Sequence, residues 1–599
     1  MAVSGDIAAT LGGVTGAVSG TVGVGGAVAA AIGGVVGAMS GKVGVGGAVA
    51  ATVGAALLVA SGAPGVSGAI SRTVAAASSS AIGTVGLSFL FQPNVINQYL
   101  VEATRWDDDA GAEVTEYLAT RDVTFEPDDT APSQAYDGRV TGALQIKREM
   151  YSDGAIGGAS LPSYGSVEIV NDDELRDGGR LAAWRAGRWD GRRLRVLMGP
   201  EGAAYADHVV LLDGTATGGP SGGLESLSLP IADLQALLDK PVQTVTYPGT
   251  GGFGGGEDVK DRVRPDVFGV VRAAVPVPVD IANGWYDLAY SGLATVSGVY
   301  DGGVPLTITA SNPPSPGQVY VDYTNGRIRV ATTPVYGLAV DCVGAATSGV
   351  CTASAICQWV ITQRLGIDAA RLDTAAFAAF GAAASAAVGM YLTDTTTAIE
   401  VLDWLVPSVG GYYSSTRRGL LTVGRLRAPT AASAADPTIA LVIDDQDIEP
   451  GSLKEVPVPS PPYRWEIGWG RNWTGQVNAS QLDQQFISTS RRSFMLSEYR
   501  VEASVQSTTQ ARNLLSKPLR SDTAIDQQSD AAAEAARRRD LFGVPRVKVT
   551  LQMQTQPFAL ELNDEVWLDS EINGINRPFV IIGLDESART SSVSLTLWG

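Results

Sequence analysis

The sequence predicts a mainly β protein with α+β parts: several small β-barrel or sandwich domains, a helical insertion, and a Gly/Val-rich repeat region at the N-terminus. Three observations predict this fold class. Short runs with a two-residue apolar period, separated by Gly and Pro, fill most of the chain after residue 88. Helical patterns are concentrated in residues 352–407 and 530–540. Residues 1–88 consist almost entirely of small residues in a repeating order.

A chain of 599 residues is expected to form several domains, because single hydrophobic cores stop growing well below this size. Shifts in composition and clusters of turn residues place the boundaries. We expect repeats that form a stalk or tip element, a first β domain, a second β domain, a helical insertion with a hairpin, and a C-terminal domain, in the ranges 1–88, 89–215, 216–345, 346–430 and 431–599.

The N-terminal region contains a repeat. Leu11–Val14 recurs as Ile32–Val35, and Ser19–Val24 recurs as Ser40–Val45, which gives a period of 21 residues. The valines follow the two-residue period of a strand. Interior glycines weaken isolated strands, so the apolar rows need neighbours. This favours a β-rich stalk shared between identical chains.

Two other interpretations of the repeat stay open. Gly12, Gly16 and Gly20 form a small-xxx-small pattern that packs transmembrane helices, although Lys42 and the glycine content oppose a helix. A disordered segment is the other alternative, weakened by the valines. A signal peptide is not expected, because no basic segment precedes an apolar core.

The central elements follow from turn and cap signals. Pro265 marks a corner before a strand that contains Val270, and Asn325-Gly326 predicts a hairpin turn. Three helices are expected between residues 352 and 407: one ends near Gly366, the second follows Asp373, and the third begins at Thr396 or Thr397 and stops at Pro407. A hairpin is expected over residues 410–426. Further strands are expected at 98–106, 113–118, 286–299, 304–310 and 318–330.

The last segment has the clearest local signals. Residues 530–540 are strong helix formers, and Gly543 and Pro545 end the helix. Strands are expected at 547–553, 562–568, 578–583 and 591–598.

Charge and composition limit the ligands. The formal net charge is −19, and phosphate binding needs a basic surface, so no specific nucleic-acid binding is expected. An acidic wall suits a pore through which DNA slides without being gripped. The only histidine, His208, lies in an apolar strand-like run and is interpreted as a packed or edge residue, which leaves no histidine metal cluster.

Other candidate sites are weak. Cys342, Cys351 and Cys357 are interpreted as free buried thiols, with a Cys342–Cys351 bridge as the alternative. Asp107–Asp109 and Asn171–Asp173 lack the spacing of a calcium loop and are interpreted as solvated turns. Gly249–Gly254 matches GxGxxG, but no apolar helical face follows, so a hairpin loop is expected. We therefore predict no catalytic residue, no cofactor and no metal, and a protein that is not an enzyme.

Three tryptophans are spaced by four. Trp465, Trp469 and Trp473 are expected on one face of a strand. With the neighbouring Arg464 and Arg471 they could stack on sugar, but a subunit interface is favoured, where aromatic residues and arginine are enriched.

Several of these segments, in fixed order, resemble the bacteriophage tail hub family (baseplate hub or tail tip proteins) of siphophage-like tails. They are the Arg264–Gly269 corner, the helices followed by Gly410-Gly411-Tyr412-Tyr413, the Arg471-Asn472-Trp473-Thr474 run, and the C-terminal helix and strands. The resemblance covers roughly residues 90–599.

The resemblance implies a structural virion protein at the tail tip. Family members form a ring, typically a homotrimer, in which two similar β-barrels per chain mimic six-fold symmetry. The ring joins the tail tube protein and the distal tail protein to fibre or tip proteins, touches the tape measure protein, serves host attachment and lets DNA pass during ejection. The repeats of residues 1–88 depart from the family and are a candidate contact with the host cell envelope. Two alternative functions are a tail-associated glycan hydrolase, which needs an acid pair in a groove, and a host-surface adhesin.

Overall fold

The structure is a computed structural model. It describes the backbone of strands between residues 2 and 75, and residues 97–599 except 126–133, 152–156, 159, 161, 171–183, 185, 224, 348, 555–559 and 589–591. The chain divides into two compact units, Met1–Gly83 and Thr84–Gly599, which we describe separately.

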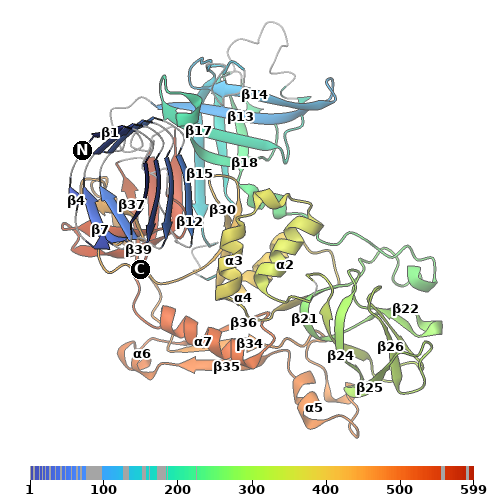
Figure 1. The fold of residues 1–599 in the computed structure, drawn as a ribbon. Coiled ribbons are helices and arrows are strands. Elements are labelled where there is room, and N and C mark those ends of the chain that lie inside the picture. The colour runs from blue at the N-terminus through green and yellow to red at the C-terminus, as the bar shows by residue number, and fades with distance from the viewer. Residues whose placement is uncertain are drawn as a thin grey trace. The chain divides into compact units, whose positions relative to one another are not determined.

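The strands of the N-terminal unit form three parallel sheets (Figure 1). Residues in paired strands are one repeat apart along the chain: Ala2 pairs with Gly23, Val36 with Leu57, and Val49 with Ile70. Consecutive strands visit the three sheets in turn, so one 21-residue repeat makes one coil of a parallel β-solenoid. The strands are β1 Ala2–Ser4, β2 Ile7–Leu11, β3 Val14–Thr15, β4 Val18–Ser19, β5 Val22–Gly25, β6 Val28–Gly33, β7 Val35–Ser40, β8 Val43–Gly46, β9 Val49–Gly54, β10 Leu57–Ser61, β11 Gly65–Ser67 and β12 Ile70–Ala75.

The described residues of the repeat lie in strands, as their two-residue apolar period predicts. The strands pair with neighbouring repeats of the same chain, as Ile7 does with Val28, Val22 with Val43 and Val28 with Val49. Like residues stack in register, as Val24 does on Val45 and Val45 on Val66. Among the described residues, no helix is both long and apolar enough to cross a membrane.

The second unit is organised around a 14-stranded sheet with an N-terminal half and a C-terminal half. Antiparallel pairing of β15 with β39, from Gln145–Ser587 to Glu149–Gly583, joins the halves. The N-terminal half contains β13 Asn97–Asp107, β14 Ala112–Ala119, β15 Val140–Glu149, β16 Tyr164–Val170, β17 Arg193–Pro200, β18 Val209–Ala216, β19 Ser221–Gly222 and β20 Ser226–Ala232. The C-terminal half contains β32 Ile439–Asp444, β33 Lys454–Val456, β37 Lys548–Met553, β38 Glu565–Ser570, β39 Ile575–Ser587 and β40 Ser592–Trp598.

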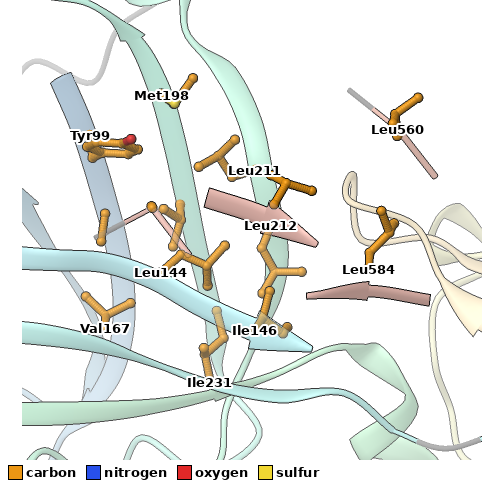
Figure 2. Close-up of a cluster of buried hydrophobic side chains, with 14 of the residues drawn as sticks. Tyr99, Leu144, Ile146, Val167, Met198, Leu211, Leu212, Ile231, Leu560 and Leu584 are labelled. Carbon is orange, nitrogen blue, oxygen red and sulfur yellow. The ribbon is translucent and has the colours of Figure 1, made fainter. Parts of the chain in front are cut away.

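One hydrophobic core lies within both halves. Figure 2 shows Leu560 and Leu584 of the C-terminal half in the same cluster as Leu144, Ile146 and Leu212 of the N-terminal half. All five side chains are buried, and each contributes about 1.5–3 kcal/mol by leaving water. The two ends of this unit therefore fold as one body.

The second sheet has nine strands and ends on β29. The Asn325-Gly326 turn is confirmed: the Asn325 N–H donates to Asp322 Oδ1 at 3.1 Å, and Gly326 has φ of +61°. The Gly249–Gly254 segment forms a loop with a short 3₁₀ turn and no α-helix after it. The strands are β21 Asp266–Ala274, β22 Val277–Asp280, β23 Trp285–Asp287, β24 Leu293–Asp301, β25 Val304–Thr309, β26 Gln318–Asp322, β27 Arg327–Val330, β28 Leu338–Gly344 and β29 Gly389–Leu392.

The three expected helices are present between the nine-stranded sheet and the hairpin. They are α2 Ala353–Trp359, which continues as a π-helical turn to Arg364, α3 Thr374–Ala383 and α4 Ala398–Ser408. Asp373 Oδ1 accepts from the Ala376 N–H at 3.0 Å, and Thr397 forms a capping box with Glu400. Pro407 lies inside the last turn of α4, so the predicted end is one residue early. The hairpin is formed by β30 Gly411–Ser415 and β31 Leu421–Arg425.

Helix α7, Gln528–Phe542, packs on a three-stranded sheet and ends at Gly543 as predicted. The sheet consists of β34 Arg464–Trp469, β35 Arg500–Val505 and β36 Pro518–Asp522. Two short helices, α5 Thr489–Met495 and α6 Ser507–Arg512, connect these elements.

The tryptophan stripe is not an exposed surface. Trp465 and Trp469 are buried within the chain, and Trp473 lies beyond the end of β34. The Trp465 ring stacks on Phe542 at 5.2 Å between centroids, and the Arg500 guanidinium lies 3.8 Å from the Trp469 ring centroid. The expectation of an interface or sugar platform is therefore wrong for Trp465 and Trp469, whose rings serve the intrachain core.

Candidate functional site: a buried charge junction

The residues weighed as chemical sites have structural roles. The His208 ring packs edge-on against Phe125, and its Nδ1 is 3.0 Å from the Ala204 carbonyl oxygen. Burial lowers the pKa of His208, which is confirmed as a packed residue. All three cysteines are free, and burial raises the pKa of the Cys342 thiol to about 12.

The Asp107–Asp109 turn uses its first carboxylate internally. Asp107 Oδ1 accepts from the N–H groups of Asp109 and Ala110 at 3.0 Å each, and Asp107 Oδ2 accepts from Arg105 at 2.6 Å. No group of three potential metal ligands occurs among the described residues. The Asn171–Asp173 segment lies outside them.

The two halves of the large sheet and the helical insertion meet at a set of buried charges, which we call the junction. Its centre is Arg417, at the tip of the β30–β31 hairpin, with a side chain only 5% exposed. The guanidinium donates to the Leu560 carbonyl from Nε at 3.0 Å and from a terminal nitrogen at 2.9 Å. It also donates to the Leu211 carbonyl at 3.4 Å and pairs with Glu586 of β39. One side chain thus binds both halves at once.

A second arginine supports the same point. Arg148, on β15, donates to the Ser415 carbonyl at 3.0 Å and pairs with Glu561. Glu561 also accepts from the backbone N–H of Arg417 at 2.8 Å. Burial alone would raise the pKa of Glu561, but Arg148 and Arg417 outweigh it and lower that pKa. The carboxylate therefore stays ionised between two cations.

Asp564 carries the unbalanced charge of the junction. Its Oδ2 accepts from the Glu561 N–H at 2.8 Å. Burial raises the pKa of Asp564 to about 6, with the Glu561 carboxylate adding to the effect. Two guanidiniums here face three carboxyl groups, Glu561, Glu586 and Asp564.

Two neighbouring clusters extend the network. Asp213, on β18, accepts from Arg193 at 3.0 Å and from Arg371 of the helical insertion at 3.2 Å. On α7, the buried Glu534 accepts from Arg425 at 2.6 Å, Arg537 at 2.8 Å and Arg538 at 2.7 Å. Hydrogen-bonded, desolvated ion pairs of this kind fix the relative positions of elements and are costly to break.

The charge junction is a positioning device. Its carboxylates Glu561, Glu586 and Asp564 each accept from an arginine or a backbone amide. Sequence reasoning missed it because Arg148 and Glu561 are 413 residues apart and Arg417 and Glu586 are 169 apart. The arginines of Thr416–Gly419 and the Glu561–Asp564 loop were the only local signal.

Solved structures of tail proteins are similar to this chain. The 43 kDa tail protein of prophage MuSo2 from Shewanella oneidensis matches at 10% identity and a TM-score of 0.33, over 84% of this chain and 98% of that one. The tail protein from Neisseria meningitidis MC58 matches at 11% identity and 0.34, over 84% and 96%. A chain of the native gene transfer agent virion matches at 12% identity and 0.37, over 60% and 91%. No family model and no curated protein sequence matches the chain.

Proposed function

We propose that this protein is the structural hub of a phage tail tip. In this proposal it forms a ring, as a homotrimer, that joins the tail tube protein and the distal tail protein to fibre or tip proteins, touches the tape measure protein, and lets DNA pass during ejection. The proposed location is the virion tail tip.

The observation that carries the proposal is the joining of strands β13–β20 with β32, β33 and β37–β40 into one sheet and one core. A hub must hold partners at different faces in fixed relative positions. Close-packed interiors deform little, so a continuous core is suited to that task. The buried Arg417 and Arg148 clamps then attach the helical insertion to the same rigid body.

The charge pattern is consistent with a passive channel wall. The formal net charge of −19 disfavours retention of DNA, and the described arginines are largely committed to carboxylates. A glycan hydrolase would need two free carboxyl groups flanking a groove. Of the three carboxylates that line the larger described cavity, Asp373 caps α3, Glu561 is paired with Arg148 and Asp540 is paired with Arg539. We therefore propose a non-enzymatic role.

The solenoid of residues 2–75 is proposed as a stalk or tip element attached to this body. Parallel solenoids are quasi-one-dimensional, so such a unit presents an elongated surface made of repeated coils. Contact with the host envelope, and hence host attachment, is its proposed task.

The test is stoichiometry and location. Native mass spectrometry of the full-length protein is expected to show three copies, which co-assemble with the distal tail protein and the tail tube protein. Antibody-gold labelling of purified virions is expected at the tail tip. A stable monomer that is missing from purified virions would refute the proposal.

A further inference from the structure

An apolar groove with a basic rim lies beside the C-terminal end of α7. It encloses about 560 Å³, within the size range of ligand pockets. One wall is the proline-rich strap Val456–Pro462, and the opposite side carries the aromatic rings of Trp465, Phe542 and Trp598. The site is thus a slot between a stiff extended segment and aromatic rings.

The rim has one sign of charge. Arg537, Arg538, Arg546 and Lys548 line the groove, and none of the lining residues that the structure describes is acidic. Such a concentration is unusual for a chain with a formal net charge of −19. The rim therefore forms a local positive potential that attracts anions.

The positive charge of the rim is only partly neutralised inside the chain. Arg537 and Arg538 share Glu534 with Arg425, so three guanidiniums face one carboxylate. Among the described residues, Arg546 pairs with no carboxylate: it donates to the Leu541 carbonyl at 2.9 Å and lies 5.1 Å from the Trp598 ring centroid. Lys548 likewise has no described acidic partner. Negative charge from outside would complete the site.

The groove continues into a second cavity of about 860 Å³. Leu426, Arg537, Leu541 and Arg546 line both. The second cavity runs along the β30–β31 hairpin and α3, and its lining adds Arg425 and Arg427 together with the carboxyl groups of Asp373, Asp540 and Glu561. An elongated site of this kind fits an extended chain better than a compact small molecule.

The hydrogen-bonding groups of the groove indicate whether its ligand is a peptide or a lipid. The strap contains Pro457, Pro459, Pro461 and Pro462, which have no N–H group. Within the described part of the chain, the carbonyls of Val458 and Pro459 accept no hydrogen bond. The groove therefore presents acceptors on the strap and donors on Arg546 and Lys548. A peptide backbone satisfies both, whereas a fatty acid supplies acceptors only.

We propose that this groove binds an extended, acidic segment of a partner protein. The apolar side chains of that segment pack on Leu519, Phe542 and Val544, and its carboxylates pair with Arg546 and Lys548. The identification of the partner as another tail protein rests on the proposed function. The acidic, extended nature of the segment follows from the groove alone.

The test uses the full chain and a fluorescein-labelled octapeptide that alternates leucine and glutamate. Fluorescence polarisation is expected to show saturable binding that weakens as salt is added. Lys548→Glu and Val544→Glu place a negative charge on the rim and the exposed apolar wall, and each is expected to weaken binding about ten-fold or more. Lys454→Glu, on the adjacent strand β33 but outside the groove, is the matched control and is expected to bind as the wild type does.

A readout without mutation guards against misfolded variants. Addition of the acidic peptide to the wild-type protein is expected to slow amide hydrogen exchange in residues 456–463 and 537–548. Specific peptide binding sites have dissociation constants well below about 1 mM, so absence of binding at about 1 mM peptide would overturn the proposal. Equal binding of a peptide with lysine in place of glutamate would also overturn it. So would binding of decanoate without binding of the acidic peptide, which would assign the groove to a lipid anion.

Discussion

Replacement of Glu534 by glutamine tests whether buried charge holds α7 in place. The Glu534 side chain is only 3% exposed and accepts hydrogen bonds from Arg425, Arg537 and Arg538. Glutamine keeps the shape of the side chain and removes its charge. Three neighbouring guanidiniums then remain in a partly buried site with no counter-ion.

The size of the effect follows from the pKa. Burial alone would raise the pKa of Glu534, but Arg537 and Arg538 lower it from the ordinary 4.5 to about 2. This lowering of the pKa from 4.5 to about 2 corresponds to a stabilisation of about 3 kcal/mol. Loss of one partner from a buried ion pair costs about 3–5 kcal/mol, which agrees. Because the folded-state pKa is depressed, this stabilisation is present above pH 4.5 and is lost as pH falls toward 2.

Hydrogen exchange of α7, followed by mass spectrometry, measures the loss directly. At pH 7, Glu534→Gln is expected to lower the protection of residues 528–542 roughly 100-fold, the equivalent of about 3 kcal/mol. Asp540→Asn is the control, because Asp540 is exposed on the same helix. In urea unfolding, the gap between Glu534→Gln and the wild type should shrink to about half by pH 3. Unchanged protection at pH 7, or a gap that widens as pH falls, would refute the reasoning.

Three further predictions concern the junction and the solenoid. Arg417→Met is expected to lower the unfolding free energy by about 3–5 kcal/mol in urea titrations, because it leaves Glu586 and the Leu560 carbonyl buried without their hydrogen-bond donor. Arg417→Lys should not restore the stability, since a lysine ammonium cannot reach both acceptors at once. An unchanged urea midpoint for Arg417→Met would contradict the role of the charge junction. Asp564→Asn is expected to raise the unfolding free energy at pH 8 by up to about 3 kcal/mol. Because the pKa of Asp564 is raised to about 6, ionisation of this carboxyl group destabilises the folded protein increasingly between pH 4 and pH 6. The stabilisation by asparagine should therefore vanish below pH 4, and a stabilisation that persists there would contradict the assignment. Deletion of residues 29–49 removes one whole repeat and should leave the thermal melting of the solenoid, followed by circular dichroism, unchanged. Deletion of residues 29–38 breaks the register between repeats and should make the region sensitive to protease. Equal protease resistance of the two variants would contradict the pairing.

Local signals in the sequence predicted local structure well. The helix near residues 530–540, its end at Gly543, the β30–β31 hairpin and the Thr397 cap were all encoded by neighbouring residues. The 21-residue period predicted strands, but a period does not say whether the partner is the next copy or another chain.

Long-range features were not predictable from one sequence. The β15–β39 pairing and the Arg148–Glu561 pair join residues more than 400 positions apart. With 62 acidic and 43 basic residues, composition alone cannot select which pair is buried. The tryptophan stripe was assigned to an outer surface because strand periodicity predicts that the rings share a face, but it does not predict what covers that face. In the structure, Phe542 of α7 covers Trp465, and Arg500 covers Trp469.

The in-register stacking of the N-terminal unit has a consequence for how its length evolves. Every strand bonds to the position one repeat away, so duplication or loss of a copy leaves both terminal coils facing the same neighbours. Each copy changes the unit by one inter-strand spacing, about 4.8 Å. Gain or loss of whole copies thus changes the length of this unit in fixed steps, without any change in the sequence of the second unit.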